Sequence, residues 1–298
     1  MKNDLPNILI IGAAKSGTTS LHNYLNQHPD IFMCSPKEPH FLINQEIGID
    51  RIPVGISEFK RYRNLFSAGK ACKYRGESSV MYLMFPEIVI PKIKKILGEN
   101  TKIIIMLRNP VDRAYSGYQH NKRYDVDENL EFEDAWNICE DRYNKIKHMT
   151  PATRYKELGM YYKQVKSFMS SFTNVHVIIY DDYQDDINKC LEKVFGFLSV
   201  NKLNLDTTTR HMVGGWEWKN GRLKYLLIKK NRFRSILKKI VFSFKLRKWI
   251  RKVIHKTNTK PTPKITSRVK IKLKKYYKED VMKLSHLLER DLNYWIDN

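Results

Sequence analysis

The sequence predicts an α/β protein in which helices flank a central parallel sheet. Short aliphatic runs alternate with helical patterns, and this alternation is typical of a parallel sheet covered on both faces. Two of the runs end in small or polar residues that lead directly into a helix, as phosphate-binding turns do. No Pro-, Gly- or Ser-rich linker divides the 298 residues, so we expect a single domain over residues 1–298.

The elements are expected in a regular order along the chain. Runs rich in Ile, Val and Leu predict buried strands, and apolar residues at helical spacing predict the helices. The expected strands are 8–13, 74–77, 102–107 and 175–180, and the expected helices are 18–26, 87–97, 111–118, 132–143, 159–172 and 187–198.

The first run, residues 8–20, reads ILIIGAAKSGTTS and predicts an anion site. A strand, a tight turn and a helix N-terminus bring unpaired N–H groups and the positive end of the helix dipole to one place. In the triphosphate loop G-x-x-x-x-G-K-[ST] the lysine follows the second glycine, whereas Lys15 precedes Gly17, which disfavours a kinase or NTPase. A lysine and several hydroxyl groups are available to an anion: Lys15, Ser16, Thr18, Thr19 and Ser20.

A second anion site is predicted in residues 103–118, which read IIIMLRNPVDRAYSGY. Arg108 follows the strand at its carboxyl end, where ligands bind in open α/β sheets, and Pro110 suits the first position of a helix. Ser116 lies about two helical turns further on. An arginine fork and a hydroxyl in this relation can hold one phosphate. The alternative is an ordinary strand-to-helix junction with a surface arginine.

Both segments resemble the sulfotransferases that use 3′-phosphoadenosine 5′-phosphosulfate (PAPS). Lys15 to Thr19 are similar to the 5′-phosphosulfate loop K-[ST]-G-T-[ST], and residues 108–118 to the 3′-phosphate site R-[ND]-P-x-[DE]-R-x-x-S-x-[YF]. Residues 37–42, KEPHFL, resemble a stretch of the carbohydrate and heparan-sulfate-type branch. Residues 76–82 resemble G-E-[KS]-[ST]-P-x-Y with Val80 in place of proline, and residues 287–295 resemble the closing helix. The resemblance implies the P-loop-like nucleotide-binding fold of that family.

The resemblance also implies an activity. The sulfuryl group of PAPS would pass to a hydroxyl or amine of a carbohydrate or glycolipid acceptor, releasing adenosine 3′,5′-bisphosphate, and no metal would be required. The donor would be bound by Lys15, Ser16, Gly17, Thr18, Thr19, Ser20, Arg108 and Ser116. Lys219 and Arg222, in a segment similar to the family's late basic loop, are further expected contacts of the 3′-phosphate.

Four residues are expected to take part in the chemistry. Lys15 would neutralise the leaving phosphate oxygen, because a point charge on a flexible stem can follow the developing charge. Glu38 matches the position that carries the general base in heparan-sulfate-type enzymes, and Lys37 beside it would orient sulfate or acceptor. His40 is the second candidate for the base. Glu77 is the third and is better suited to a structural role.

The charge is concentrated in one region. The net charge is +23, and residues 219–278 contain 23 Lys and Arg but no Asp or Glu. Apolar residues at i, i+3 and i+4 spacing between these charges predict a basic amphipathic helix: Phe233, Ile236, Leu237, Ile240, Val241 and Phe244. Peripheral contact of residues 230–254 with an anionic membrane or an acidic acceptor is one interpretation, and a helix packed on the domain is the other. No nucleic-acid-binding motif accompanies the charge, so no nucleic acid is expected as a partner.

The spacing of the cysteines suggests in which cellular compartment the protein is located. Cys34, Cys72, Cys139 and Cys190 show no C-x-x-C spacing, which suits a reducing compartment and offers no metal site. The chain reaches its first strand without a signal peptide and has no long apolar run, so we expect a soluble, cytoplasmic protein of bacterial type. Two other functions remain open: a P-loop-type nucleotide kinase or NTPase, and a noncatalytic protein that binds polyanions or membranes.

Overall fold

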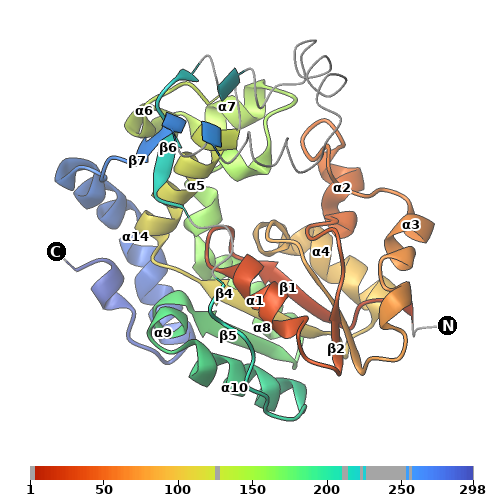
Figure 1. Cartoon of the computed structure of the whole chain (residues 1–298). Helices are drawn as coiled ribbons and strands as arrows, with labels where there is room; N and C mark the ends of the chain where they lie inside the picture. Colours follow the sequence, from red (N-terminus) through yellow and green to blue (C-terminus); the bar gives the residue numbers. More distant parts are fainter. Residues whose placement is uncertain are drawn as a thin grey trace.

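The core of the protein is a five-stranded sheet in which every strand pair is parallel. The computed structural model describes residues 4–124, 128–209, 214–221, 224–225, 253–254 and 257–297. The strand order is β2-β3-β1-β4-β5 (Figure 1). The strands are β1 (Ile8–Gly12), β2 (Ile31–Met33), β3 (Tyr74–Ser78), β4 (Lys102–Leu107) and β5 (Val175–Ile179). The expected parallel α/β fold is confirmed, and β2 is an additional strand that the sequence did not predict.

Both faces of the sheet are buried, as near-continuous aliphatic strands require. Alternate residues of β1 enter different clusters, because successive side chains of a strand point to opposite faces. Ile8 and Ile10 pack with α1 (Thr18–Leu25), α9 (Tyr180–Asp185) and α10 (Ile187–Leu198). Leu9 and Ile11 belong to the larger cluster, which takes in α4 (Pro86–Lys92), α8 (Tyr161–Ser171) and α14 (Ser267–Leu287). The helices cover both sides of the sheet (Figure 1).

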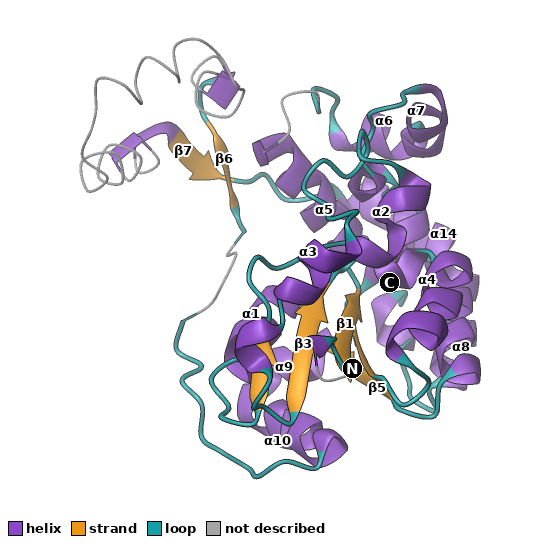
Figure 2. Cartoon of the chain, turned by 90° about the vertical axis from the view of Figure 1, so that its right-hand side faces the viewer, coloured by secondary structure: helices purple, strands orange, loops and turns teal. Residues whose placement is uncertain are grey.

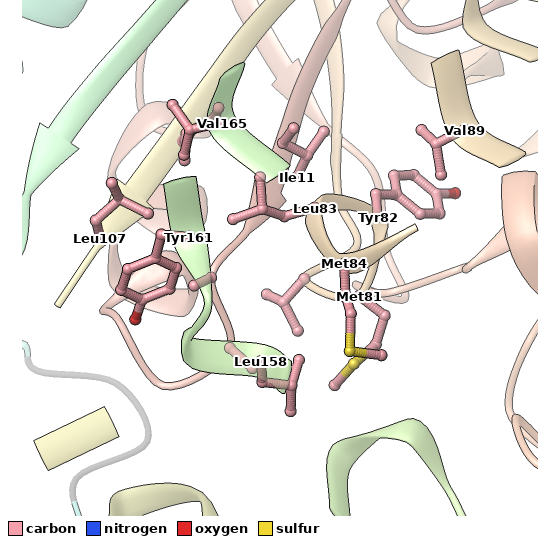
Figure 3. Close-up of a cluster of buried hydrophobic side chains, with 14 of the residues drawn as sticks. Ile11, Met81, Tyr82, Leu83, Met84, Val89, Leu107, Leu158, Tyr161 and Val165 are labelled. Carbon is pink, nitrogen blue, oxygen red and sulfur yellow. The ribbon is translucent and has the colours of Figure 1, made fainter. Parts of the chain in front are cut away.

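The larger cluster extends to the carboxyl edge of the sheet. Figure 3 shows Ile11 of β1 and Leu107 of β4 close to Leu83 and to Tyr161 of α8. The fit is tight, since a Cβ added to Gly12 would lie 2.7 Å from Leu83 Cβ. This packing supports the turns that follow β1 and β4.

Several helices differ from the expectation in extent. The helix expected over 111–118 is α5 (Pro110–Tyr124), which continues for almost two further turns at its C-terminal end. The helix expected over 132–143 is interrupted at Ile138, which separates α6 (Phe132–Asn137) from α7 (Cys139–Lys145). Among the described residues, four helices were not predicted: α2 (Phe41–Ile47), α3 (Phe59–Asn64), α9 and α14. Single turns or π-turns complete the fold: Ser67–Gly69, Tyr82–Met84, Ile93–Leu97, Pro151–Thr153, Glu157–Gly159 and Asn293–Trp295.

The prediction of a closing helix over residues 287–295 is wrong. α14 ends at Leu287, and only the turn Asn293–Trp295 follows. The segment instead attaches to α9 through its side chains: Arg290 forms two 2.7 Å hydrogen bonds with Asp182, and Trp295 Nε1 donates to Asp181 at 2.7 Å. These side-chain contacts, with the turn hydrogen bond from the Trp295 N–H to the Leu292 carbonyl, hold the segment in place of a continuous helix.

A second, two-stranded sheet lies apart from the main one and next to α5 (Figure 2). It pairs β6 (Trp216–Trp218) antiparallel with β7 (Thr259–Pro261). The predicted basic amphipathic helix over 233–244 lies outside the described residues. Among the residues that are described, no helix is long and apolar enough to cross a membrane.

Candidate functional site

The candidate site is a cavity of about 620 Å³ at the carboxyl ends of β1 and β4. These strands are neighbours, and the chain leaves them toward opposite sides of the sheet, which is where open α/β sheets bind ligands. The cavity brings together eight residues that the sequence singled out: Lys15, Gly17, Thr18, Thr19, Ser20, Glu38, Arg108 and Ser116. The two anion sites predicted separately thus form one site.

The loop after β1 presents backbone donors to this cavity. Lys15 and Gly17 both have left-handed backbones, with φ of 70° and 88°. The N–H groups of Ser20 and Leu21 donate to the Gly17 carbonyl at 3.0 and 3.2 Å. The N–H groups of Thr18 and Thr19 precede these in the first turn of α1, where an N–H has no partner within the helix. The loop can therefore bind an anion.

Arg108 joins this loop to the end of β4. Its Nη1 donates to the Lys15 carbonyl at 3.2 Å, and its guanidinium lies 4.9 Å from the centre of the Tyr180 ring. The same ring limits the space at Gly17, where a Cβ would lie 3.0 Å from Tyr180 Cε2. Tyr161 donates its hydroxyl to the Arg108 carbonyl at 3.0 Å. Arg108 is thus oriented by contacts on both sides.

The cavity is electropositive. Among the described residues, its lining contains the cations Lys15, Arg108, Arg113 and Arg123 but only two carboxylates, Glu38 and Asp112. Burial, with the charges of Arg123 and Arg108, lowers the pKa of Lys15 to about 8. Buried cations that repel one another gain most from an anionic ligand, because it relieves both the repulsion and the lost hydration.

Glu38 enters the cavity from the loop between β2 and α2. Its carboxylate lies 2.5 Å from Lys37 Nζ and 3.5 Å from His40 Nε2, and its side chain is 36% exposed. Burial alone would raise the pKa of Glu38, but the hydrogen bond with His40 and the Lys37 charge outweigh it and hold that pKa below its usual range. Lys37 and His40 do not line the cavity. They contact the Glu38 carboxylate, which does. Both Glu38 and His40 have left-handed backbones, with φ of 63° and 51°.

Glu77 supports the loop between β2 and α2 through a network of buried hydrogen bonds. It is fully buried, and it accepts hydrogen bonds from Tyr62 at 2.5 Å, Ser79 at 2.6 Å and Tyr82 at 3.1 Å. Ser79 Oγ in turn accepts the His40 N–H at 3.1 Å. Burial raises the pKa of Glu77. Its position agrees with the structural role preferred from the sequence, and it does not line the cavity.

Two predicted donor contacts, Ser16 and Lys219, are not brought into the cavity, and a third cannot be placed. Ser16 is fully buried behind the loop, and its hydroxyl has no partner among the described residues. Lys219 is exposed on the second sheet, where its Nζ donates to the Thr257 carbonyl at 3.2 Å. Arg222 lies outside the described residues.

Two cavity residues were missed from the sequence, His120 and Arg123. They follow Ser116 on α5 by one and two turns, and their spacing of four and seven residues would have indicated them had the helix been expected to extend past residue 118. His120 Nδ1 lies 3.4 Å from Lys15 Nζ. Burial and the Lys15 charge lower the pKa of His120 to about 4, so its ring is neutral near pH 7. In the described ranges, no three His, Cys, Asp or Glu side chains are grouped as metal ligands.

A parallel sheet with a cationic cavity beyond two adjacent strands, entered by a strand–loop–helix turn, is typical of proteins that bind phosphate esters such as nucleotides. Comparison with known proteins specifies the class further. The chain belongs to the family described as "Sulfotransferase domain", whose model matches residues 5–285.

Several proteins of known name are similar to the chain. A sulfotransferase from Alicyclobacillus acidocaldarius is 28% identical, with a TM-score of 0.73 over 98% of this chain and 99% of that one. The bifunctional heparan sulfate N-deacetylase/N-sulfotransferase 1 of Mus musculus is 28% identical over 65% of this chain and 22% of that protein. The human carbohydrate sulfotransferase 15 is 26% identical over 67% and 45%, respectively. The chain thus spans less than half the length of these two relatives.

Proposed function

We propose that the protein transfers the sulfuryl group of PAPS to a hydroxyl or amine of a carbohydrate or glycolipid, releasing adenosine 3′,5′-bisphosphate. The observation that carries this proposal is the hydrogen bond from Arg108 to the Lys15 carbonyl, which makes one site of two anion-binding turns. A donor with a phosphate at each end of its nucleoside suits such a site. The names of the similar heparan sulfate and carbohydrate sulfotransferases support the acceptor class.

The residues can be assigned to the two ends of the donor. The loop of Lys15, Gly17, Thr18 and Thr19 would bind the 5′-phosphosulfate, and Arg108 with Ser116 the 3′-phosphate. Lys15 would stabilise the charge that develops on the leaving phosphate oxygen, as preorganised cations do in phosphoryl transfer. Its depressed pKa and its place in the loop support this role.

The acceptor must lose a proton as the S–O or S–N bond forms, and Glu38 is our candidate for the base. It is ionised over the whole physiological range and lies in the cavity that contains Lys15. Lys37 pairs with Glu38, so the acceptor must displace or share that contact before Glu38 can accept the proton. His120, neutral and 3.4 Å from Lys15 Nζ, is the second candidate: Nδ1 is its acceptor nitrogen and faces the Lys15 ammonium, so His120 can take a proton only after that contact is broken.

We further propose that residues 1–298 act as one domain in the cytoplasm. The four cysteines are all free thiols, as is usual in reducing compartments. Peripheral membrane contact through residues 230–254 remains a prediction for a segment that is mostly outside the described residues.

The proposal is tested by calorimetric titration with adenosine 3′,5′-bisphosphate and with ATP plus Mg²⁺. We expect the bisphosphate to bind and ATP to bind at least tenfold more weakly. Labelled sulfate should then pass from PAPS into glycans extracted from the source organism. Binding of ATP alone, with magnesium-dependent turnover, would instead establish a kinase or NTPase. Tight binding of the bisphosphate with no transfer to any extract would favour a noncatalytic protein.

A further inference from the structure

Arg123 is a buried cation that the proposed chemistry does not use. Its side chain belongs to the last turn of α5, and the residue is 3% exposed. Nη1 donates to the Trp216 carbonyl of β6 at 3.0 Å, and the guanidinium lies 5.3 Å from the centre of a Trp216 ring. Gly214 covers it from another side, since a Cβ there would lie 3.6 Å from Nη2.

Among the described residues, none balances the charge of Arg123. In the described part of the chain no carboxylate pairs with it, and its Nε is buried without a hydrogen-bond partner. Burial lowers the pKa of Arg123, although an arginine still keeps its proton at neutral pH. Burying a guanidinium whose N–H donors lack partners costs free energy, unless an anion accepts their hydrogen bonds and balances the charge. The cavity is where that anion can enter, because Arg123 is part of its lining.

The position of Arg123 along α5 indicates which ligand reaches it. Ser116, His120 and Arg123 follow one another on the cavity side of this helix. Ser116 lies on the side proposed for the 3′-phosphate, and His120 is next to Lys15, where the sulfuryl group is transferred. Arg123 lies one turn beyond His120, about 10 Å along the helix from Ser116. It therefore lies on the opposite side of the Lys15–His120 contact from the proposed 3′-phosphate site, which leaves this side of the cavity for an acceptor.

We propose that Arg123 is a specificity residue that binds an anionic group of the acceptor, a carboxylate or a sulfate ester close to the reacting hydroxyl or amine. This inference rests on the proposed sulfotransferase function. The planar guanidinium suits either anion, because its parallel N–H groups match their oxygens. Binding the acceptor's anion at Arg123 would place the neighbouring nucleophile near Glu38 and Lys15.

The test measures glycan binding with and without saturating adenosine 3′,5′-bisphosphate. Three defined oligosaccharides are compared: one of alternating glucuronate and unsubstituted glucosamine, its carboxyl-reduced form, and a glucan oligosaccharide whose only charged groups are sulfate esters. We expect the wild type to prefer at least one anionic oligosaccharide over the reduced form by tenfold or more. The preferred arm identifies the anion.

Arg123→Gln should reduce that preference to less than about twofold, and Arg123→Lys should retain part of it, because a point charge is kept while the fork is lost. Lys122→Gln is the matched control, since Lys122 contacts Glu131 and Tyr118 and is not in the cavity lining. It should leave the preference unchanged. Thermal unfolding of each variant detects loss of fold, and the preference ratio is a readout that loosening of β6 alone would not change.

Two outcomes overturn this inference. One is a wild type that binds no anionic oligosaccharide better than the reduced form. The other is an Arg123→Gln variant that loses affinity for the bisphosphate more than about fivefold, which would assign Arg123 to the donor. Failure of the wild type to bind the bisphosphate contradicts the proposed function instead, and the titrations without nucleotide still report the preference at Arg123.

Discussion

The two halves of the cavity are built in different ways. The half assigned to the donor consists of the loop after β1 and Arg108 after β4, two continuous segments at the edge of one sheet. The half assigned to the acceptor combines Glu38 from a loop, His120 and Arg123 from α5, and Gly214 and Gly215 beside β6. The first half depends on local backbone geometry, and the second on contacts between distant parts of the chain. Substitutions should therefore separate donor binding from acceptor chemistry.

The largest effect is expected in the acceptor half. Glu38→Gln removes the proposed base and should lower turnover by about 10²–10⁴-fold, the usual contribution of general base catalysis. Affinity for adenosine 3′,5′-bisphosphate should remain within about threefold, because the substitution keeps the shape of the side chain. Steady-state kinetics and calorimetry measure the two quantities. His120→Gln is the companion variant: if it abolishes turnover while Glu38→Gln remains active, His120 is the base.

Loss of a cation from the donor half should act on binding itself. Lys15→Ala and Arg108→Ala each remove a charged partner of the nucleotide, which typically costs about 2–5 kcal/mol, or roughly 30-fold to 10³-fold or more in affinity for the bisphosphate. Lys166→Ala is a suitable control, since Lys166 is exposed on α8 and contacts Tyr162 outside the cavity. Wild-type affinity in both cavity variants would refute the assignment of this half to the donor.

Donor affinity should also depend on pH. The pKa of Lys15 is lowered to about 8, so the free protein loses this charge as the pH rises above 8. A bound anion favours the protonated lysine, and affinity for the bisphosphate should therefore fall by up to about tenfold per pH unit above 8. Calorimetry between pH 7 and 9.5 measures the slope. Lys15→Arg should flatten it, because arginine stays protonated throughout this range.

The smallest effect expected is on stability, at the glycine that begins α1. Gly17→Ala should destabilise the fold by about 1–2 kcal/mol, because φ of 88° is unfavourable for alanine and its Cβ would press on Tyr180. Gly196→Ala within α10 is the matched control. A Cβ at Gly196 would meet nothing within 4 Å, and alanine should stabilise the helix by about 0.5–1 kcal/mol. Opposite signs in chemical denaturation would support a strained donor loop, and equal signs would contradict it.

The same contrast explains what could be predicted from the sequence. The donor half was predictable because a buried strand, a small-residue turn and a helix start are all local patterns, and β1, α1, β4 and α5 begin close to where they were expected. β2 was missed because three residues are too few to show a period.

The acceptor half was less predictable because its contacts are not local. Arg123 is held by Trp216, 93 residues later, and its spacing from Ser116 becomes informative only once the length of α5 is known. Lys219 was placed by a motif alone, and its actual neighbours, Thr257 and Asn258, come from another segment. The structural role of Glu77 was anticipated, but its partners Tyr62 and Tyr82 were not.

The bond between Arg108 and the Lys15 carbonyl has a consequence for ligand selection. It holds two anion-binding turns, 93 residues apart in sequence, at a set separation. A ligand with two suitably spaced phosphates then binds bivalently: once one end is bound, the other is at a high effective concentration, and the cost of immobilising the ligand is met only once. Nucleotides with a single phosphate, such as 5′-AMP or 3′-AMP, should lose far more affinity than one contact accounts for. The separation between the turns thus selects a donor by the distance between its two phosphates.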